Sequence, residues 1–381
     1  MRVLFFNEGN LGSHIMGQGR LDDALNVGLQ ETPGIEARFA GLTPMGRAAS
    51  AAATRPLRPL DRWNLDFRTL RWHLVQSSRA RTALRRELAA WPADVALVHS
   101  QSVALMMGRV MAELPVAVSL DTTIADWSGM PAWRAPQSYA AALLAPSRAM
   151  ERRALERAAV VLAWTGWARR AAEAEAPRAR VLEHHPGIDL DRYRPAPRGP
   201  RALPRILFVG GRFAEKGGED LLAALGEDLG RSVELDIVTP AEVDPRPGVR
   251  VHRLGPSDPR LLDLHQQADV FCLPSYGDAA PWAVLEAMAC GTPVVATAVG
   301  GIADMLDGGR AGVLVELGDR AGLAGALGGL LADEGRRGEL AGAARRRCAE
   351  AYDARRQFAR LVDLLAGLRP ASRLRAAQQD P

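Results

Sequence analysis

Short apolar runs alternate with longer amphipathic stretches along both halves of the chain. Val, Ile and Leu dominate these runs, and turn signals bound them, which is the pattern of buried β-strands. Strands that alternate with helices predict parallel sheets covered by helices on both faces, so each half is expected to form a doubly wound α/β unit. The predicted strands are 2–6, 94–99, 115–120 and 159–164 in the first half, and 205–209, 233–238, 249–254, 269–273 and 293–296 in the second.

The length of 381 residues is more than one hydrophobic core usually serves, and it predicts two domains. Between the two halves, residues 193–204 read YRPAPRGPRALP. Its prolines are incompatible with a central strand or a helix interior. We interpret this segment as the linker.

The composition is that of an ordinary folded protein, with 48% hydrophobic and 24% charged residues. The three cysteines have no metal-ligand spacing, which favours thiols that act as small hydrophobes in a reducing compartment. The opening MRVLFFNEGN has too short an apolar run for a secretory core or a spanning helix. We therefore expect a cytoplasmic protein whose contact with a membrane, if any, is peripheral at the inner face.

Positive charge is concentrated in residues 55–91, where nine arginines stand against three acids, a net charge of +6 (9 − 3). Large apolar residues in this stretch fall near helical spacing beside the arginines, which is typical of a helix attracted to an anionic membrane surface. The alternative is a solvated face over an ordinary core stripe. A pI of 9.3 alone does not indicate nucleic-acid binding, because no module of interleaved aromatic and basic residues accompanies it.

Two strand-to-helix turns are candidates for ligand contact, because ligands of open parallel sheets gather at the carboxyl ends of the strands. The first turn, NEGNLGSH, includes Gly12 and His14 and lacks the G-x-G-x-x-G spacing of a dinucleotide fingerprint. The second, GGRFAEKGG, contains Gly211, Arg212 and Lys216, which is the one lysine of the chain. A phosphate there would meet a planar guanidinium fork and a compact ammonium. A solvated surface lysine is the alternative.

The stretch 273–306, LPSYGDAAPWAVLEAMACGTPVVATAVGGIADML, is the most specific signal. It predicts a helix that begins at Pro281 and stops near Gly291, with Asp278 ahead of it and Glu286 in its second turn. The two carboxylates are placed to contact two parts of one ligand, and exposed amides around Ala279 and Ala280 sit at the positive end of the helix. Taken singly, Asp278 is also typical of a turn former and Glu286 of an exposed helix acid.

These motifs resemble the retaining GT-B glycosyltransferases of family 4, the glycosyl transferases group 1. VGGRFAEKGG matches the family's diphosphate loop, DAAPWAVLE matches its E-x7-E element with Asp in place of the first Glu, and HHPGIDLDRYRP and GNLGSH are similar to two further family segments. The resemblance implies two Rossmann-like, doubly wound parallel-sheet domains with an interdomain cleft. It places an acceptor-side domain at 1–192 plus a C-terminal helix in 353–381, and a donor-binding domain at 204–352.

The resemblance also implies roles for individual residues. Arg212 and Lys216 would hold the nucleotide diphosphate, Glu286 the ribose, and Asp278 the hydroxyls of the donor sugar. Asp121 follows a predicted strand where related enzymes often place a histidine, and it is either a catalytic group or a turn cap. His14 and His99 are expected near the acceptor or sugar, although His99 is equally typical of a core histidine. The implied donor-binding set is Gly12, Gly211, Asp278, Ala279, Ala280, Pro281, Leu285 and Glu286.

The implied activity is metal-independent transfer of a hexose from a UDP- or GDP-linked donor to a hydroxyl of a glycan, lipid or small-molecule acceptor, with retention of configuration and no cofactor. The histidines and acids show no metal-ligand spacing. Two alternatives remain open: a nucleotide-sugar 2-epimerase of the same fold, and an inactive protein that binds a nucleotide sugar or a membrane surface. The missing dinucleotide fingerprint disfavours a nicotinamide oxidoreductase.

Overall fold

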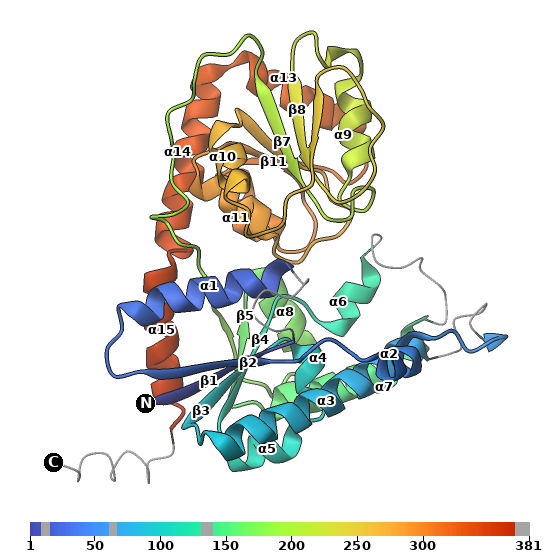
Figure 1. Ribbon diagram of the computed structural model, residues 1–381, viewed down its shortest axis with the longest axis vertical. Helices are drawn as coiled ribbons and strands as arrows, with labels where there is room; N and C mark the ends of the chain where they lie inside the picture. The colour runs from blue at the N-terminus through green and yellow to red at the C-terminus, as the bar shows by residue number, and fades with distance from the viewer. Residues whose placement is uncertain (9–15, 61–66, 131–139, 370–381) are drawn as a thin grey trace. The chain divides into compact units, whose positions relative to one another are not determined.

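A computed structural model of the chain describes residues 1–8, 16–60, 67–130 and 140–369, and these fall into two compact units (Figure 1). The first unit comprises residues up to Pro186, apart from a short segment after Gly129, together with the residues from Arg355 onward. The second comprises Gly187–Ala354. Each unit is built around a parallel sheet with its own hydrophobic core.

The sheet of the first unit has six parallel strands in the order β2-β1-β3-β4-β5-β6. Asn7, His99 and Ser119 are register neighbours on β1, β3 and β4, so their carboxyl ends meet at one edge of the sheet. The strands are β1 (Arg2–Asn7), β2 (Glu36–Gly41), β3 (Val95–His99), β4 (Val116–Leu120), β5 (Val160–Ala163) and β6 (Val181–Glu183).

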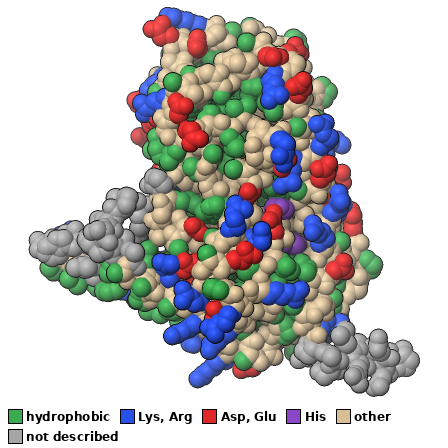
Figure 2. Space-filling model, turned by 180° about the vertical axis from the view of Figure 1, so that it is seen from behind, with side chains coloured by type: hydrophobic (Ala, Val, Ile, Leu, Met, Phe, Trp, Pro, Cys, Tyr) green, Lys and Arg blue, Asp and Glu red, His purple; other side chains and the backbone are tan. Residues whose placement is uncertain are grey.

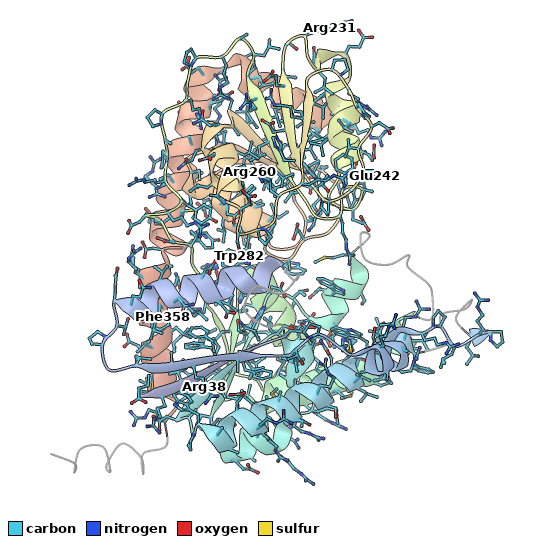
Figure 3. All side chains as sticks on the ribbon, viewed as in Figure 1. Arg38, Arg231, Glu242, Arg260, Trp282 and Phe358 are labelled. Atoms are coloured by element: carbon cyan, nitrogen blue, oxygen red, sulfur yellow. The ribbon has the colours of Figure 1, made fainter. Side chains whose placement is uncertain are left out.

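Helices connect these strands, and the last helix of the chain completes the same unit. Phe358 of this helix packs on the ring of Phe5 with centroids 6.3 Å apart, and a Cβ at Gly28 would lie 2.1 Å from the Phe358 Cβ (Figure 3). Residues far apart in sequence therefore share one core. The helices are α1 (Met16–Gln30), α2 (Arg47–Thr54), α3 (Arg68–Ala90), α4 (Gln101–Ala104), α5 (Gly108–Glu113), α6 (Ile124–Gly129), α7 (Ala140–Arg157), α8 (Gly166–Glu175) and α15 (Ala354–Ala366).

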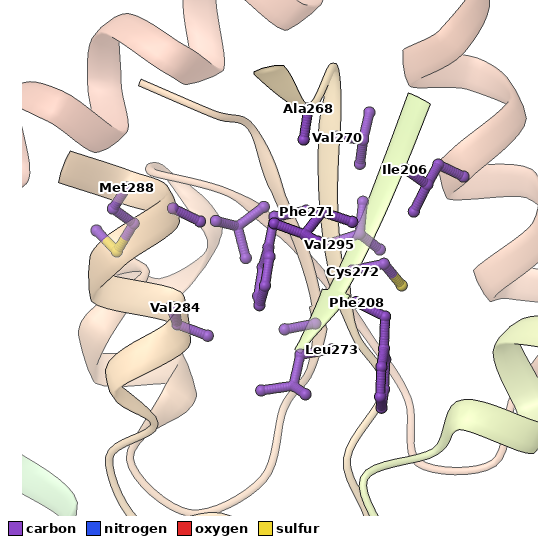
Figure 4. Packing of buried hydrophobic residues seen from close by; sticks show 14 of the residues in the cluster. Ile206, Phe208, Ala268, Val270, Phe271, Cys272, Leu273, Val284, Met288 and Val295 are labelled. Carbon is purple, nitrogen blue, oxygen red and sulfur yellow. The ribbon is translucent and has the colours of Figure 1, made fainter. Parts of the chain in front are cut away.

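The sheet of the second unit also has six parallel strands, in the order β12-β11-β10-β7-β8-β9. Val284 of α11 points toward Phe271 and Leu273 of β10, and these three side chains are buried together with Met288 of the same helix (Figure 4). The strands are β7 (Arg205–Val209), β8 (Glu234–Val238), β9 (Val249–His252), β10 (Val270–Leu273), β11 (Val294–Thr297) and β12 (Val313–Val315). The helices are α9 (Gly218–Leu225), η2 (Gly226–Asp228), α10 (Pro259–Gln267), α11 (Trp282–Ala289), α12 (Ile302–Met305), η3 (Asp307–Gly309), α13 (Arg320–Ala332) and α14 (Glu334–Ala351).

The proline-rich segment 193–204 contains no helix or strand, and hydrogen bonds attach it to the second unit. The ring of Tyr193 is buried, and the side-chain amides of Gln266 and Gln267 donate to the carbonyls of Arg194 and Pro197 at 2.9 and 3.1 Å. The side chains of a neighbouring helix therefore satisfy carbonyls that an extended, proline-rich chain leaves without backbone partners.

Acidic and basic side chains are interspersed over much of the face shown in Figure 2. Within the described parts of the chain, no helix is both long and apolar enough to cross a bilayer.

Candidate functional site

The turn between β7 and α9 holds the lone lysine in a fixed backbone. Phe213 anchors the turn, since its ring is buried and meets Phe208 edge-on at 5.5 Å. The amide of Lys216 donates to the Arg212 carbonyl at 2.9 Å, and that of Gly218 donates to the Phe213 carbonyl at 2.8 Å. Gly211 lies at the start of this turn, and the Arg212 side chain is exposed at its tip.

Gly217 is required where this turn meets the loop that follows β10. Its φ is +77°, and a Cβ there would lie 1.9 Å from the Pro274 carbonyl oxygen. Any other residue would therefore combine a left-handed backbone with a steric clash. The amide of Tyr276 donates to the Glu215 carbonyl at 3.0 Å, which ties the two loops together a second time.

These loops bring Lys216 onto Asp278. The ammonium donates to the Asp278 carboxylate, and it lies 3.4 Å from the carbonyl oxygen of Gly277. Both side chains are largely but not fully buried, with 17% and 12% of their surfaces exposed. Partial burial strengthens the attraction while leaving both groups accessible to a ligand.

A third loop, after β11, packs against the backbone of Asp278 and Ala279. Gly300 has φ +54°, and a Cβ there would lie 1.8 Å from the Asp278 carbonyl oxygen. The amide of Gly301 donates to the Ala279 carbonyl at 2.9 Å, and the Thr297 hydroxyl donates to the Ser275 carbonyl at 2.5 Å. The carboxyl ends of β7, β10 and β11 thus form one interlocked group of loops.

The helix α11 begins next to Asp278. The sequence predicted Pro281 as the first residue of this helix. In the structure Pro281 is the N-cap, because its ψ of 119° is extended. Ala279 and the side chain of Leu285 are buried, whereas Ala280 and Pro281 are half-buried. The first turn of a helix carries partial positive charge, which favours an anionic or hydroxyl-rich ligand.

Glu286 is buried, with 3% of its surface exposed, so it is not an exposed helix acid. The Tyr193 hydroxyl donates to its Oε1 at 3.2 Å, and His265 Nε2 lies 3.3 Å from its Oε2. His265 is fully buried in α10. Sequence reasoning assigned no role to either partner: Tyr193 lies in the quoted segment HHPGIDLDRYRP, and His265 has no motif around it.

In the first unit, His99 is packed into the core at the end of β3. Its ring stacks on Trp164 at 4.7 Å, and its Nδ1 lies 3.2 Å from the Ser119 carbonyl oxygen. Burial lowers the pKa of the imidazole to about 4, so the ring is neutral at neutral pH. Gly12 and His14 lie outside the described residues.

Asp121 is half-buried after β4, at the turn that leads into α6. Thr123 caps this turn: its hydroxyl accepts from the Asp126 amide at 3.2 Å and donates to the Asp126 carboxylate at 2.9 Å. Thr123 therefore caps the start of α6, and both roles considered for Asp121 stay predictions.

Glu8, at the end of β1, forms a polar cluster that sequence reasoning missed. Its Oε2 accepts from the hydroxyls of Ser100 and Ser102 at 3.0 and 2.9 Å. Its position directly after the first strand is the signal that could have identified it from the sequence. Within the part of the chain that the structure describes, no three His, Cys, Asp or Glu side chains gather as a metal-ion site.

Comparisons with known proteins agree with this geometry. Residues 203–333 match the family model of the glycosyl transferases group 1. Among curated relatives, a D-inositol 3-phosphate glycosyltransferase 2 of Catenulispora acidiphila is 36% identical over 36% of this chain and 39% of its own length. The chain therefore matches only about two fifths of this relative's length.

Solved structures match nearly the whole chain in fold. A sucrose-phosphate synthase from Thermosynechococcus elongatus superimposes with a TM-score of 0.72 and 17% identity, covering 97% of this chain and 99% of that one. The Anabaena protein HepE, solved in complex with UDP-glucose, gives a TM-score of 0.66 and 15% identity over 95% of this chain and 100% of that one. The predicted fold is confirmed: the chain has two parallel six-stranded sheets with flanking helices, arranged as in GT-B proteins.

Proposed function

Residues 203–333 of this chain belong to the glycosyl transferases group 1 family, and from this premise we propose that the protein is a retaining glycosyltransferase of family 4. It would transfer a hexose from a nucleoside diphosphate donor to a hydroxyl acceptor. The observation that carries the proposal is the contact of Lys216 with Asp278 across the loops after β7 and β10.

The reaction needs positive charge where the diphosphate leaves. As the glycosidic bond opens, negative charge grows on the phosphate oxygens, and donors fixed in advance lower the barrier most. Lys216 and the exposed Arg212 would supply this charge, with the amides at the start of α11 beside them. Gly211 lets the backbone approach the phosphates closely.

Donor binding would rearrange the Lys216–Asp278 pair. The ammonium would turn to the diphosphate, and the released Asp278 carboxylate would accept hydrogen bonds from the sugar hydroxyls. A carboxylate oxygen has two lone pairs, so Glu286 can keep its bond from Tyr193 and still accept from a ribose hydroxyl. Asp121 of the first unit would face the reacting sugar and accept a proton or hydrogen bond there.

We propose UDP as the carrier of the donor sugar, because HepE, which shares the fold, binds UDP-glucose. The acceptor would bind to the first unit, through Asp121 and the loop that contains Gly12 and His14. The whole of this unit lies outside the family match, so the acceptor is proposed only by class, as a hydroxyl of a glycan, lipid or small molecule.

Thermal unfolding in the presence of UDP-, GDP- and ADP-sugars tests the proposal. A donor that binds only the folded state stabilises it by about 2.7 kcal/mol at one hundred times its dissociation constant, so one nucleotide should raise Tm by several degrees. The same samples should release nucleoside diphosphate once an acceptor is present. The proposal fails if no nucleotide sugar shifts Tm and none is consumed.

A further inference from the structure

The first half of α3 does not bury its part of the predicted core stripe, whereas Leu84 in the second half is buried as predicted. Its buried residues are mostly polar or small, whereas Phe67 at its N-cap and Leu74 expose 45% and 38% of their surfaces. Apolar residues of a surface helix normally face the core. The buried residues are His73, Gln76, Ser77, Ala80 and Leu84.

One buried contact joins α3 to α7 in this orientation. His73 Nδ1 lies 3.0 Å from the Ser147 hydroxyl of α7, whereas the Ser77 hydroxyl is satisfied within α3, where it donates to the His73 carbonyl at 2.6 Å. Rotating the helix to bury Leu74 would break the contact between His73 and Ser147. The apolar side chains therefore remain on the outside.

The segment after α2 extends the same surface. Leu57 and Leu60 each expose 43% of their surface. Arg55 and Arg58, which lie near them in the sequence, are also exposed. The Arg71 guanidinium of α3 donates to the Arg55 carbonyl at 2.8 Å, which fixes this segment beside the start of α3 (Figure 1). We call these residues the basic-apolar edge: Arg55, Leu57, Arg58, Leu60, Phe67 and Leu74.

The charge of this edge is strongly one-sided. Residues 55–91, which contain the edge, have nine arginines and three acids, a net charge of +6 (9 − 3). Arg38 pairs with Glu87, but neither Arg55 nor Arg58 forms an ion pair with any residue in the ranges that the structure describes. Two exposed guanidinium groups thus lie beside exposed leucines.

We propose that the basic-apolar edge docks on the surface of an anionic lipid bilayer. Guanidinium groups would pair with lipid phosphates, while the leucines and Phe67 would enter the boundary between headgroups and acyl chains. Pro56 and Pro59 have no backbone N–H, so fewer backbone donors lose water there. A nucleic-acid partner would account for the arginines but not for the exposed leucines.

Co-sedimentation of the full chain with vesicles tests the proposal, using pure phosphatidylcholine and mixtures with phosphatidylglycerol. We expect binding only to the anionic vesicles, weakened by salt. Arg55→Glu with Arg58→Glu should lower the partition coefficient about tenfold or more, because each basic residue contributes measurably near an anionic surface. Leu57→Ser with Leu60→Ser should weaken binding without changing net charge.

The matched control is Arg109→Glu with Arg153→Glu, which makes the same charge change at two exposed arginines elsewhere in the first unit. It should bind as the wild type does, and all variants should keep the wild-type Tm and nucleotide protection. Absence of binding to anionic vesicles overturns the proposal. So does an equal loss in the control, or unchanged binding in either edge variant.

Discussion

The side chains at the carboxyl ends of the strands differ in accessibility between the two units. In the second unit, three loops are tied to one another through backbone bonds and two glycines, and they leave Lys216 and Asp278 partly accessible. In the first unit, the strand ends hold titratable groups that are sealed from water, such as His99. The contrast indicates a second unit prepared for a charged ligand and a first unit in which burial keeps the imidazole of His99 neutral at a strand end.

Removing the positive charge of Lys216 or Arg212 should have the largest effect on turnover. Lys216→Ala should lower turnover roughly 10²-fold or more, because a fixed donor to the leaving phosphate is lost, and Arg212→Ala should act in the same direction. Nucleoside diphosphate release under saturating donor measures this. Arg231→Ala, which removes only an exposed pair with Glu227, is the control. Near-normal turnover in both site variants would remove the basis of the assignment.

Breaking the interlocked loops should affect stability next most strongly. Gly217→Ala combines φ +77° with a Cβ 1.9 Å from a carbonyl oxygen, and we expect it to cost about 3 kcal/mol of unfolding free energy. Gly308→Ala has the same left-handed backbone, φ +64° and ψ 25°, but open space around its Cβ, so about 1 kcal/mol is expected there. Urea unfolding compares the two. Equal losses would mean that the loop contact adds nothing to backbone strain.

Removing a hydrogen bond that holds Glu286 should have a smaller effect, confined to the KM for the donor. Tyr193→Phe removes the hydroxyl that donates to Oε1 of the buried carboxylate, a bond to a charged group that contributes about 1.5 kcal/mol or more. We expect KM for the donor to rise about tenfold while kcat at saturating donor changes little. A fall in kcat at constant KM would argue against a role for Tyr193 in ribose binding.

Two buried ionisable groups of the first unit, Glu151 and His99, should make the unfolding free energy depend on pH in opposite directions. Burial raises the pKa of Glu151 to about 8, so the folded state binds the extra proton and stability falls as pH rises from 4.5 toward 8. Burial lowers the pKa of His99 to about 4, so stability falls as pH drops from 6.5 toward 4. Each slope is about 1.4 kcal/mol per pH unit within its window.

Urea unfolding at pH 5 and pH 6 separates the two. The stability of Glu151→Gln relative to the wild type should rise between these pH values, and that of His99→Gln should fall. Parallel curves for a variant and the wild type would show that the replaced group does not titrate on unfolding.

The fold was predictable because buried parallel strands are continuous apolar runs. The run at Arg205–Val209 has the predicted bounds, whereas β2 was missed. β2 reads EARFAG, an edge strand whose charged and apolar residues give no continuous run. β6 and β12 have three residues each, which is too short for a pattern.

Side-chain partners were much less predictable than strands. Lys216 and Asp278 were both candidates, but their 62-residue separation carries no sign that they touch. The exposure of Leu74 on α3 could not be derived from its apolar spacing, because the contact between His73 and Ser147 of α7 is long-range. Local patterns record which residues prefer burial, and they do not record long-range pairing.

The last helix, α15, closes the core of the first unit, with Phe358, Leu361 and Leu365 almost fully buried. During translation, these three side chains leave the ribosome only after every residue of the second unit has been synthesised. The nascent first unit must therefore wait with an open apolar groove over β1 and Gly28. Vectorial synthesis thus makes the domain that begins first the one that is finished last.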